Sequence, residues 1–513
     1  MRLSACAAGF AAILASAQVL AAAAPAWAAE PARPEAAKAE VKKDADVGDL
    51  PPFPADAHIT QVTHVAGKTL NYTATVGSLP VRDEKGKKIA EVVFTAYTLD
   101  GPHDSATRPV TFAFNGGPGA ASVFLNLGAI GPKRLQFGAA GDASSDPAQL
   151  QDNPATWLDF TDLVFIDPVG TGFSRSLVSE DETKKRFWAV KPDIEYLSRI
   201  VYDWLLKNER MRSPKYIVGE SYGGFRGPRI THYLQTTMGV GVNGVVLVSP
   251  YLDSEMWTGS GFSPMGWVDS LPTLAAANYE RQGKPLTPET LAEVETYARG
   301  EFVVDLLKGA QDQAAVGRIV ERVGHFTGLD PVLLKRWGGR IDNFAVQREI
   351  YRDQGRIGAW YDSNVTAWDP FPWSPDQQSE DPILASVVAP TTQGMVDFVT
   401  RVAGWKYEGR YFTLNEAVGE AWENGHRIAG IESVTDLRQA VALDPKLKVL
   451  IVNGYDDLAC PYFASKLIVE QMPRMDGQGR VQARAYPGGH MFYNRPDSGA
   501  AFRRDVMSLY GAP

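Results

Sequence analysis

The sequence predicts an α/β protein whose parallel sheet is interrupted by a long insertion. Short apolar runs, each followed by glycine or another turn residue, alternate with stretches of helical periodicity; the runs are residues 110–114, 163–166, 216–218 and 245–248. Runs of this kind are typical of strands that are buried on both faces of a parallel sheet. The strand pattern stops after Pro250 and resumes only at residues 449–452 and 481–485, which predicts the insertion.

The remaining elements follow from local periodicity. Between residues 58 and 99, apolar and polar residues alternate in short stretches around a turn at Gly86 and Lys87, a pattern that predicts antiparallel strands and hairpins. Residues 194–208 carry apolar side chains at helical spacing and predict a crossover helix before the strand at 216–218. Within the insertion, Thr287 and Pro288 predict the start of a helix.

The first residues predict an exported protein. Arg2 is followed by an apolar, alanine-rich run that reaches Ala24, and the small residues around Trp27 form a cleavage site. We assign residues 1–29 to a signal peptide and expect a periplasmic or secreted protein, with an uncleaved anchor helix as the alternative. Residues 30–55 are rich in Ala, Glu, Lys and Pro and predict a disordered linker.

Composition narrows the class of function. The net charge of -9 argues against a nucleic-acid partner, and no membrane association is expected after signal cleavage. Removal of the signal peptide leaves one cysteine, Cys460, so no intramolecular disulfide is expected. The chain has no recognisable metal-ligand spacing, and its glycine pattern at residues 239–244 precedes a strand, so we expect no metal and no cofactor. The oligomeric state stays open.

A glycine-flanked serine follows the predicted strand at residues 216–218. Gly219, Ser221 and Gly223 match the pattern G-x-S-x-G, in which a strained turn between a strand and a helix exposes the serine hydroxyl. Small residues on both sides let the backbone pass close to its neighbours. Ser221 is therefore the candidate nucleophile, and the alternative is a glycine-rich turn whose serine has no catalytic role.

A serine nucleophile needs a base that is itself oriented by a carboxylate, and in folds with this turn the acid precedes the histidine along the chain. The histidines that follow Ser221 are His232, His325, His426 and His490. Only His490 lies in a loop directly after a predicted strand near the C-terminus, which makes it the predicted base. The strand at residues 449–452 delivers Asp456 and Asp457 to the next loop, and spacing alone does not choose between them.

A second glycine-rich loop, Asn-Gly-Gly-Pro-Gly at residues 115–119, follows the first parallel strand. An α/β-hydrolase contributes one oxyanion-hole N–H group from this position, and the other comes from the residue after the nucleophile, here Tyr222. The alternative is a simple turn. Together with the serine turn and the His490 loop, this loop predicts an α/β-hydrolase fold.

The predicted fold has a large, partly helical insertion, or cap, between strands of the core sheet. We assign residues 56–253 to the first part of the core, residues 254–440 to the cap and residues 441–513 to the second part of the core.

Five segments in this order resemble the serine carboxypeptidase family, and they look closest to its bacterial branch. They are residues 115–119, 167–174 and 219–224, the loop around Asp457, and residues 489–491. The resemblance favours Asp457 as the acid, because the family places its aspartate four residues before the position of Pro461. It also implies that the N–H groups of Gly117 and Tyr222 hold the oxyanion.

The resemblance implies a serine-type carboxypeptidase that releases C-terminal amino acids from peptide substrates through an acyl-enzyme at Ser221. Asn115 and Glu220 correspond to the family's residues for the terminal carboxylate, and Glu220 would have to be protonated to accept it. Eukaryotic members carry a second glutamate at the position of Ala129. Without it, we expect Glu220 to ionise more readily, so that activity tolerates less acidic conditions or binding of termini is weak.

An esterase or acyltransferase with the same triad is the alternative function. A binding protein without catalysis is disfavoured, because nucleophile, base, acid and oxyanion loop are all present.

Overall fold

The computed structural model describes residues 50–512, except 105, 137–144, 146, 257–262, 375–377, 423–430 and 476–478. The predicted signal peptide and residues 30–49 of the predicted linker lie outside the described residues. Over the described residues, no helix combines the length and the apolar character that a membrane span requires.

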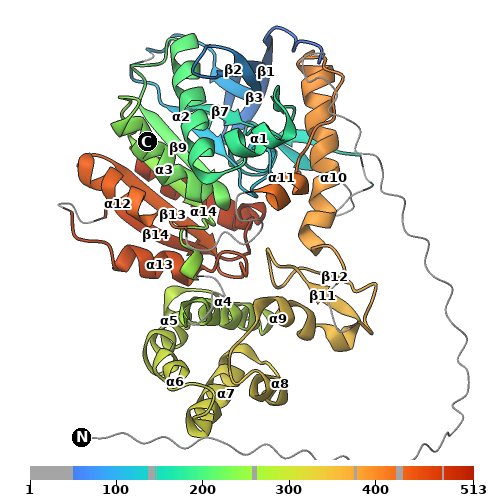
Figure 1. Ribbon diagram of the computed structural model, residues 1–513, viewed down its shortest axis with the longest axis vertical. Helices are drawn as coiled ribbons and strands as arrows, with labels where there is room; N and C mark the ends of the chain where they lie inside the picture. The colour runs from blue at the N-terminus through green and yellow to red at the C-terminus, as the bar shows by residue number, and fades with distance from the viewer. Residues whose placement is uncertain are drawn as a thin grey trace, which may run out of the picture. The chain divides into compact units, whose positions relative to one another are not determined.

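A ten-stranded mixed sheet forms the centre of the described part of the chain, in the order β1-β2-β3-β7-β4-β9-β10-β13-β14, with β8 paired to β3 (Figure 1). The antiparallel strands are β1 (Ala57–Val65), β2 (Lys68–Arg82), β3 (Lys88–Leu99) and β8 (Arg175–Ser176). The parallel strands are β7 (Asp162–Ile166), β4 (Val110–Phe114), β9 (Lys215–Glu220), β10 (Gly244–Val248), β13 (Lys448–Gly454) and β14 (Val481–Tyr486). Each strand predicted from the sequence is present, and β7 joins the two parts as the antiparallel neighbour of β3.

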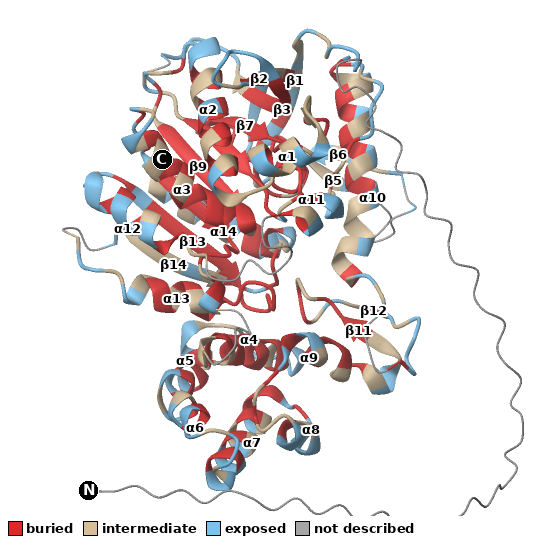
Figure 2. Ribbon diagram, in the orientation of Figure 1, coloured by how far each residue is buried: buried red, intermediate tan, exposed pale blue. Residues whose placement is uncertain are grey.

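Helices cover both faces of this sheet. One face packs against α1 (Glu180–Phe187), α2 (Val190–Lys207), α3 (Tyr222–Thr236) and α12 (Val434–Leu443). The other face packs against α14 (Pro496–Tyr510) and the π-helical turn η2 (Leu125–Ile130). In β10, Val245 and Leu247 point to the first face, and Val246 and Val248 point to the second, because side chains alternate along a strand. The buried strands between exposed helix surfaces (Figure 2) form the predicted α/β-hydrolase fold.

Part of the predicted insertion forms a separate helical group (Figure 1). Its elements are α4 (Met265–Arg281), α5 (Pro288–Tyr297), α6 (Val303–Lys308), α7 (Gln313–Thr327), α8 (Pro331–Arg336), α9 (Asn343–Glu349), β11 (Arg356–Gly358) and β12 (Thr366–Trp368). These helices share a hydrophobic cluster with Tyr455 and with α13 (Tyr462–Glu470) of the core. The helix predicted at Thr287 is confirmed as α5, since the Thr287 side chain accepts from the N–H of Thr290.

The last part of the insertion packs on the sheet itself. α10 (Pro382–Asp397), the turn η6 (Phe398–Val402) and the segment up to α11 (Glu416–Ala421) run along the second face. Phe398, Trp405 and Tyr411 are buried in the same cluster as the sheet residues. The shorter elements are β5 (Lys133–Gln136), β6 (Gln149–Asp152), η3 (Ser254–Met256), η4 (Ala298–Phe302), η5 (Arg352–Gln354) and η7 (Phe492–Asn494).

Candidate active site

Ser221 occupies a strained turn between β9 and α3. Its backbone has φ 60° and ψ -122°, a conformation that costs a non-glycine residue free energy and persists only where its surroundings enforce it. A Cβ atom on Gly219 would collide with the carbonyl of Gly223, and one on Gly223 would collide with the carbonyl of Phe114. Glycine is therefore required at both flanking positions, and the turn has the geometry that exposes a nucleophilic serine.

His490 and Asp457 meet in loops that follow the adjacent strands β14 and β13. The Nδ1 atom of His490 lies 2.8 Å from Oδ2 of Asp457, and both side chains are buried. The other oxygen of Asp457 accepts the N–H groups of Ala459 (2.9 Å) and Cys460 (3.0 Å). With Nδ1–H donating to Asp457, Nε2 of the imidazole is left to act as the base.

The surroundings of His490 fix its position and its charge preference. Its N–H group donates to the carbonyl of Tyr361 (2.5 Å), its carbonyl accepts from the Ser249 hydroxyl (2.8 Å), and its ring lies 5.0 Å from the Tyr361 ring. Burial by itself lowers the pKa of the imidazole, but the Asp457 carboxylate raises it, and the net pKa lies well above the ordinary value. Asp457 therefore stabilises the imidazolium that forms when His490 accepts a proton.

The two aspartates that spacing left open turn in different directions. Asp457 reaches His490, whereas Asp456 faces Arg495, 3.5 Å away. Asp456 is buried, and burial raises its pKa well above the ordinary value. Of the two, Asp457 is therefore the one placed to orient the histidine.

The loop at residues 115–119 approaches the start of α3 closely. A Cβ atom on Gly116 would collide with the peptide nitrogen of Tyr222, and Gly117 has φ 97°, which favours glycine. Tyr222 is the first residue of α3, a position whose N–H group has no partner within the helix. The loop that carries Gly117 therefore lies directly against the peptide nitrogen of Tyr222, the other predicted oxyanion donor.

A buried ion pair that sequence analysis missed supports this loop. Arg226, on α3, pairs with Asp193 of α2 at 2.7 Å and donates to the carbonyl of Asn115 at 2.8 Å. Both charged side chains are about 1% exposed. In the sequence, only the arginine one turn beyond the serine pattern hints at this ion pair. Its partners could not be identified there, because they are distant along the chain.

Glu220 and Asn115 lie together in a buried hydrogen-bonded cluster. The amide of Asn115 donates to Oε2 of Glu220 at 2.8 Å, and its oxygen accepts the N–H group of Leu125 at 2.9 Å. The Tyr493 hydroxyl lies 3.0 and 3.1 Å from the two carboxyl oxygens of Glu220. The predicted carboxylate-binding pair is thus brought together, and Tyr493, which sequence analysis did not single out, joins it.

Burial raises the pKa of Glu220, whereas the sequence analysis expected this rise to depend on a second glutamate. Ala129 lies buried in η2, and a Cβ atom on the adjacent Gly128 would touch the Tyr493 ring at 3.3 Å. Burial raises the pKa of Glu220 to about 7, although His490, Tyr493 and Asn115 act to lower it. The Asp457 carboxylate adds a smaller increase, so a raised pKa of Glu220 does not require a glutamate at the position of Ala129.

The other histidines that follow Ser221 in the sequence are not part of the His490–Asp457 pair. His232 pairs with Asp436 at 2.8 Å, His325 lies on α7, and His426 is outside the described residues. Within the described ranges, Asp457, Cys460 and His490 are the one group whose ligand atoms gather within 4.8 Å. Burial raises the pKa of the Cys460 thiol to about 11, which disfavours the thiolate that a metal would need.

Comparison with known proteins gives a family match and several relatives. Residues 69–256 match the family model described as serine carboxypeptidase. The pheromone-processing carboxypeptidase KEX1 of Yarrowia lipolytica is 23% identical over 380 residues, 73% of this chain and 54% of that protein. KEX1 of Colletotrichum graminicola is 23% identical over 377 residues, 71% of this chain and 51% of that protein. These matches support the serine carboxypeptidase family.

Other serine carboxypeptidase relatives come from plants. Serine carboxypeptidase-like 50 of Arabidopsis thaliana is 30% identical over 161 residues, 31% of this chain and 33% of that protein. These relatives are fungal and plant proteins, so they give no support to the predicted bacterial branch. The chain spans about half the length of the KEX1 relatives that it matches.

A solved carboxypeptidase structure shares the fold. The crystal structure of KEX1(delta)p, a prohormone-processing carboxypeptidase from Saccharomyces cerevisiae, has a TM-score of 0.52 and 16% sequence identity. The match covers 86% of this chain and 91% of that chain. At this identity the likeness concerns the fold alone.

Proposed function

We propose that this protein is a serine-type carboxypeptidase that releases C-terminal amino acids from peptides through an acyl-enzyme at Ser221. The observation that carries the proposal is the cluster at the carboxyl ends of neighbouring strands. There, the strained Ser221 turn is directly preceded by Glu220, which is bonded to Asn115, and the buried His490–Asp457 pair follows β14 and β13. Ser221 with the His490–Asp457 pair suits acyl transfer, and Glu220 with Asn115 suits recognition of a free carboxyl end.

The proposed reaction begins when His490 accepts the proton of the Ser221 hydroxyl, whose oxygen attacks the carbonyl carbon of the last peptide bond. The N–H groups of Gly117 and Tyr222 hold the oxyanion of the tetrahedral intermediate, and one such donor contributes about 3 kcal/mol. His490 then donates its proton to the leaving amine, and the C-terminal amino acid departs. Water, deprotonated by His490, hydrolyses the ester at Ser221.

Recognition of the chain end falls to Asn115 and Glu220. A protonated Glu220 can donate a hydrogen bond to the substrate carboxylate, whereas an ionised Glu220 repels it. The pKa of about 7 keeps the protonated form available in acidic and near-neutral conditions. We also propose export, on the basis of residues 1–29; the periplasm and the bacterial branch stay predictions from the sequence.

Covalent labelling tests the catalytic claim. A fluorophosphonate probe should label the wild type, and Ser221→Ala should abolish labelling and lower kcat/KM by at least about 10⁴-fold. Ser508→Ala, which changes an exposed serine on α14, is the matched control and should leave both unchanged. A wild type that does not react with the probe would contradict the proposal.

Substrate termini separate the proposed activity from its alternatives. Peptides with free C-termini should lose their last residue, and the same peptides with amidated C-termini should react far more slowly. Equal rates on the two series, or cleavage only of ester substrates, would instead support an esterase or acyltransferase that uses the same triad.

A further inference from the structure

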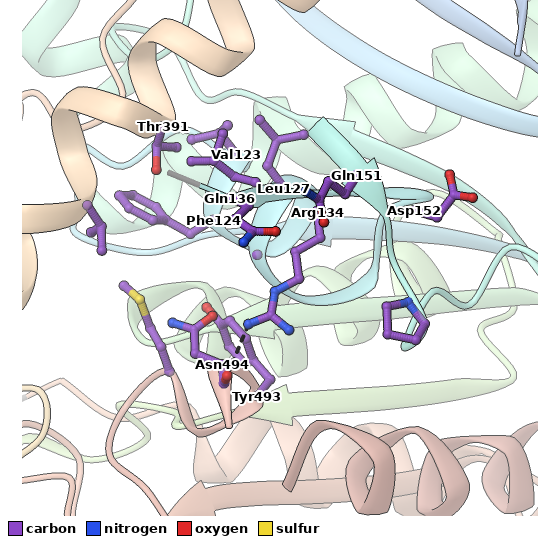
Figure 3. A pocket seen from close by; sticks show the side chains of 15 residues that line it. Val123, Phe124, Leu127, Arg134, Gln136, Gln151, Asp152, Thr391, Tyr493 and Asn494 are labelled. Carbon is purple, nitrogen blue, oxygen red and sulfur yellow. Dashed lines mark hydrogen bonds between the residues drawn. The ribbon is translucent and has the colours of Figure 1, made fainter. Parts of the chain in front are cut away.

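A cavity of about 550 Å³ is lined in part by Tyr493 (Figure 3), a member of the proposed carboxylate-binding cluster. Tyr493, which bonds to Glu220, and Met491, which follows the catalytic histidine, both line it. A volume of this size falls within the roughly 300–1,000 Å³ range of small-molecule sites. The cavity thus shares Tyr493 with the cluster that we propose binds the terminal carboxylate, which makes it a candidate site for the last side chain of the peptide.

The cavity has apolar walls and one basic side chain. Val123, Phe124, Leu127 and Val387 supply apolar surface. Arg134 extends from β5 toward Tyr493 and Asn494 (Figure 3), and its guanidinium donates to the carbonyl of Asn494 at 3.0 Å. Among the described residues, this one bond leaves most of the five guanidinium N–H groups of Arg134 for a ligand.

Charges around the cavity leave Arg134 without a counter-ion among the described residues. Asp152, the acidic residue of the lining, is held by Lys133 at 2.5 Å and by His64 at 2.5 Å. Burial lowers the pKa of Arg134, as expected for a cation that is partly removed from water. A carboxylate that entered the cavity would meet an available positive charge in a partly desolvated site, where such a pair is stronger than on the surface.

We propose that this cavity receives the side chain of the substrate's C-terminal residue and that Arg134 selects an aspartate or glutamate at that position. The inference rests on the proposed carboxypeptidase function and adds a substrate class to it. Arg134 acts as a specificity residue, since it takes no part in the proton transfers at Ser221.

The test compares blocked dipeptides that differ only in the last residue, glutamate, glutamine, leucine or lysine. At pH 6 the substrate glutamate is ionised and Glu220 is protonated. We expect kcat/KM for glutamate to exceed that for glutamine by about 10- to 100-fold, as a charge-assisted hydrogen bond would give. Arg134→Gln should bring this ratio close to one while kcat/KM for leucine changes less than about threefold, and Arg134→Glu should favour lysine.

Arg199→Gln is the control, because it removes one positive charge from an exposed pair with Asp203 on α2 and should keep the wild-type ratio. Two results would overturn the inference and leave the carboxypeptidase function standing. One is that the wild type hydrolyses the leucine peptide but shows no preference for glutamate over glutamine. The other is that the preference for glutamate survives in Arg134→Gln.

If no peptide is hydrolysed, a binding experiment separates the cavity assignment from the proposed carboxypeptidase function. It measures the binding of fluorescent glutamate and glutamine peptides to Ser221→Ala. Tighter binding of the glutamate peptide that is lost on adding Arg134→Gln would support the cavity assignment even then. Equal binding of the two peptides would reject it.

Discussion

Glu220 shows how a single buried carboxyl can link the chemistry of this site to pH. Its side chain is 2% exposed and is held by Asn115 and Tyr493. Burial raises its pKa to about 7, because water no longer solvates the charged form. The protonated side chain, which can donate to a substrate carboxylate, is present below this pKa and is lost as the pH rises through it.

Glu220→Gln should therefore remove the pH dependence of KM for peptides with free C-termini. In the wild type, KM for peptides with free C-termini should rise as the pH increases from 6 to 8, approaching tenfold per unit above the pKa of about 7. In Glu220→Gln, KM should stay nearly constant over this range, because the amide does not ionise.

Steady-state kinetics on a free-terminus peptide and on its methyl ester would check this prediction, since the ester lacks the carboxylate. Glu182→Gln, at a half-exposed helix position, should behave like the wild type. A wild-type KM that does not change between pH 6 and 8 would contradict the assignment of Glu220.

At the scale of elements, Arg495 connects the cap to the loop that carries Asp456 and Asp457. It follows η7 and bonds to Glu280 of α4, to Asp362 of the cap at 3.0 Å and to Asp456 at 3.5 Å. Burial raises the pKa of Asp362 and of Asp456, while the bonds to Arg495 outweigh burial at Glu280 and lower its pKa to about 2. One guanidinium thus compensates three carboxyls that would otherwise repel one another.

Arg495→Gln should destabilise the fold by about 2 kcal/mol, the scale for leaving buried carboxyls without their charged partner, reduced because the side chain is 33% exposed. The loss should be larger at pH 8 than at pH 5. Asp362 and Asp456 have raised pKa values, so their protonated forms stabilise the fold at low pH and that contribution disappears as the pH rises.

Urea denaturation at both pH values measures this difference. Arg401→Gln, in an exposed pair with Asp397, should change stability by less than about 0.5 kcal/mol at either pH. An Arg495→Gln variant as stable as the wild type at pH 8 would show that the cluster does not hold the cap.

For the whole molecule, the long insertion contributes both a helical cap and part of the core. Trp405 is fully buried within the insertion and packs against Phe53, near the start of the described chain, and Phe173, at ring distances of 5.2 and 5.8 Å. Trp373, also in the insertion, is 79% exposed. Two tryptophans of one segment therefore have opposite environments, because only one of them lies against the sheet.

Trp405→Ala should cost about 3–5 kcal/mol of unfolding free energy, the range for removing a buried aromatic side chain. Trp373→Ala should cost less than about 0.5 kcal/mol, as for an exposed position. Thermal and chemical denaturation followed by circular dichroism would compare the two variants, and equal losses would contradict the packing of this segment on the core.

The sequence by itself determined the features that depend on neighbouring residues. The parallel strands, the glycines around Ser221 and the cap of α5 at Thr287 all follow from patterns within a few positions, because backbone geometry and strand burial act locally. The position of His490 after a strand near the C-terminus was visible in the same way.

Only the tertiary structure decided which side chains meet. Asp456 and Asp457 are neighbours in one loop, so spacing could not show which one turns to His490. Tyr493 reaches Glu220 across 273 residues and Arg134 reaches Asn494 across 360, contacts that no local pattern encodes. The pKa of Glu220 belongs to the same class, since burial, the largest cause of its rise, depends on residues that are distant along the chain.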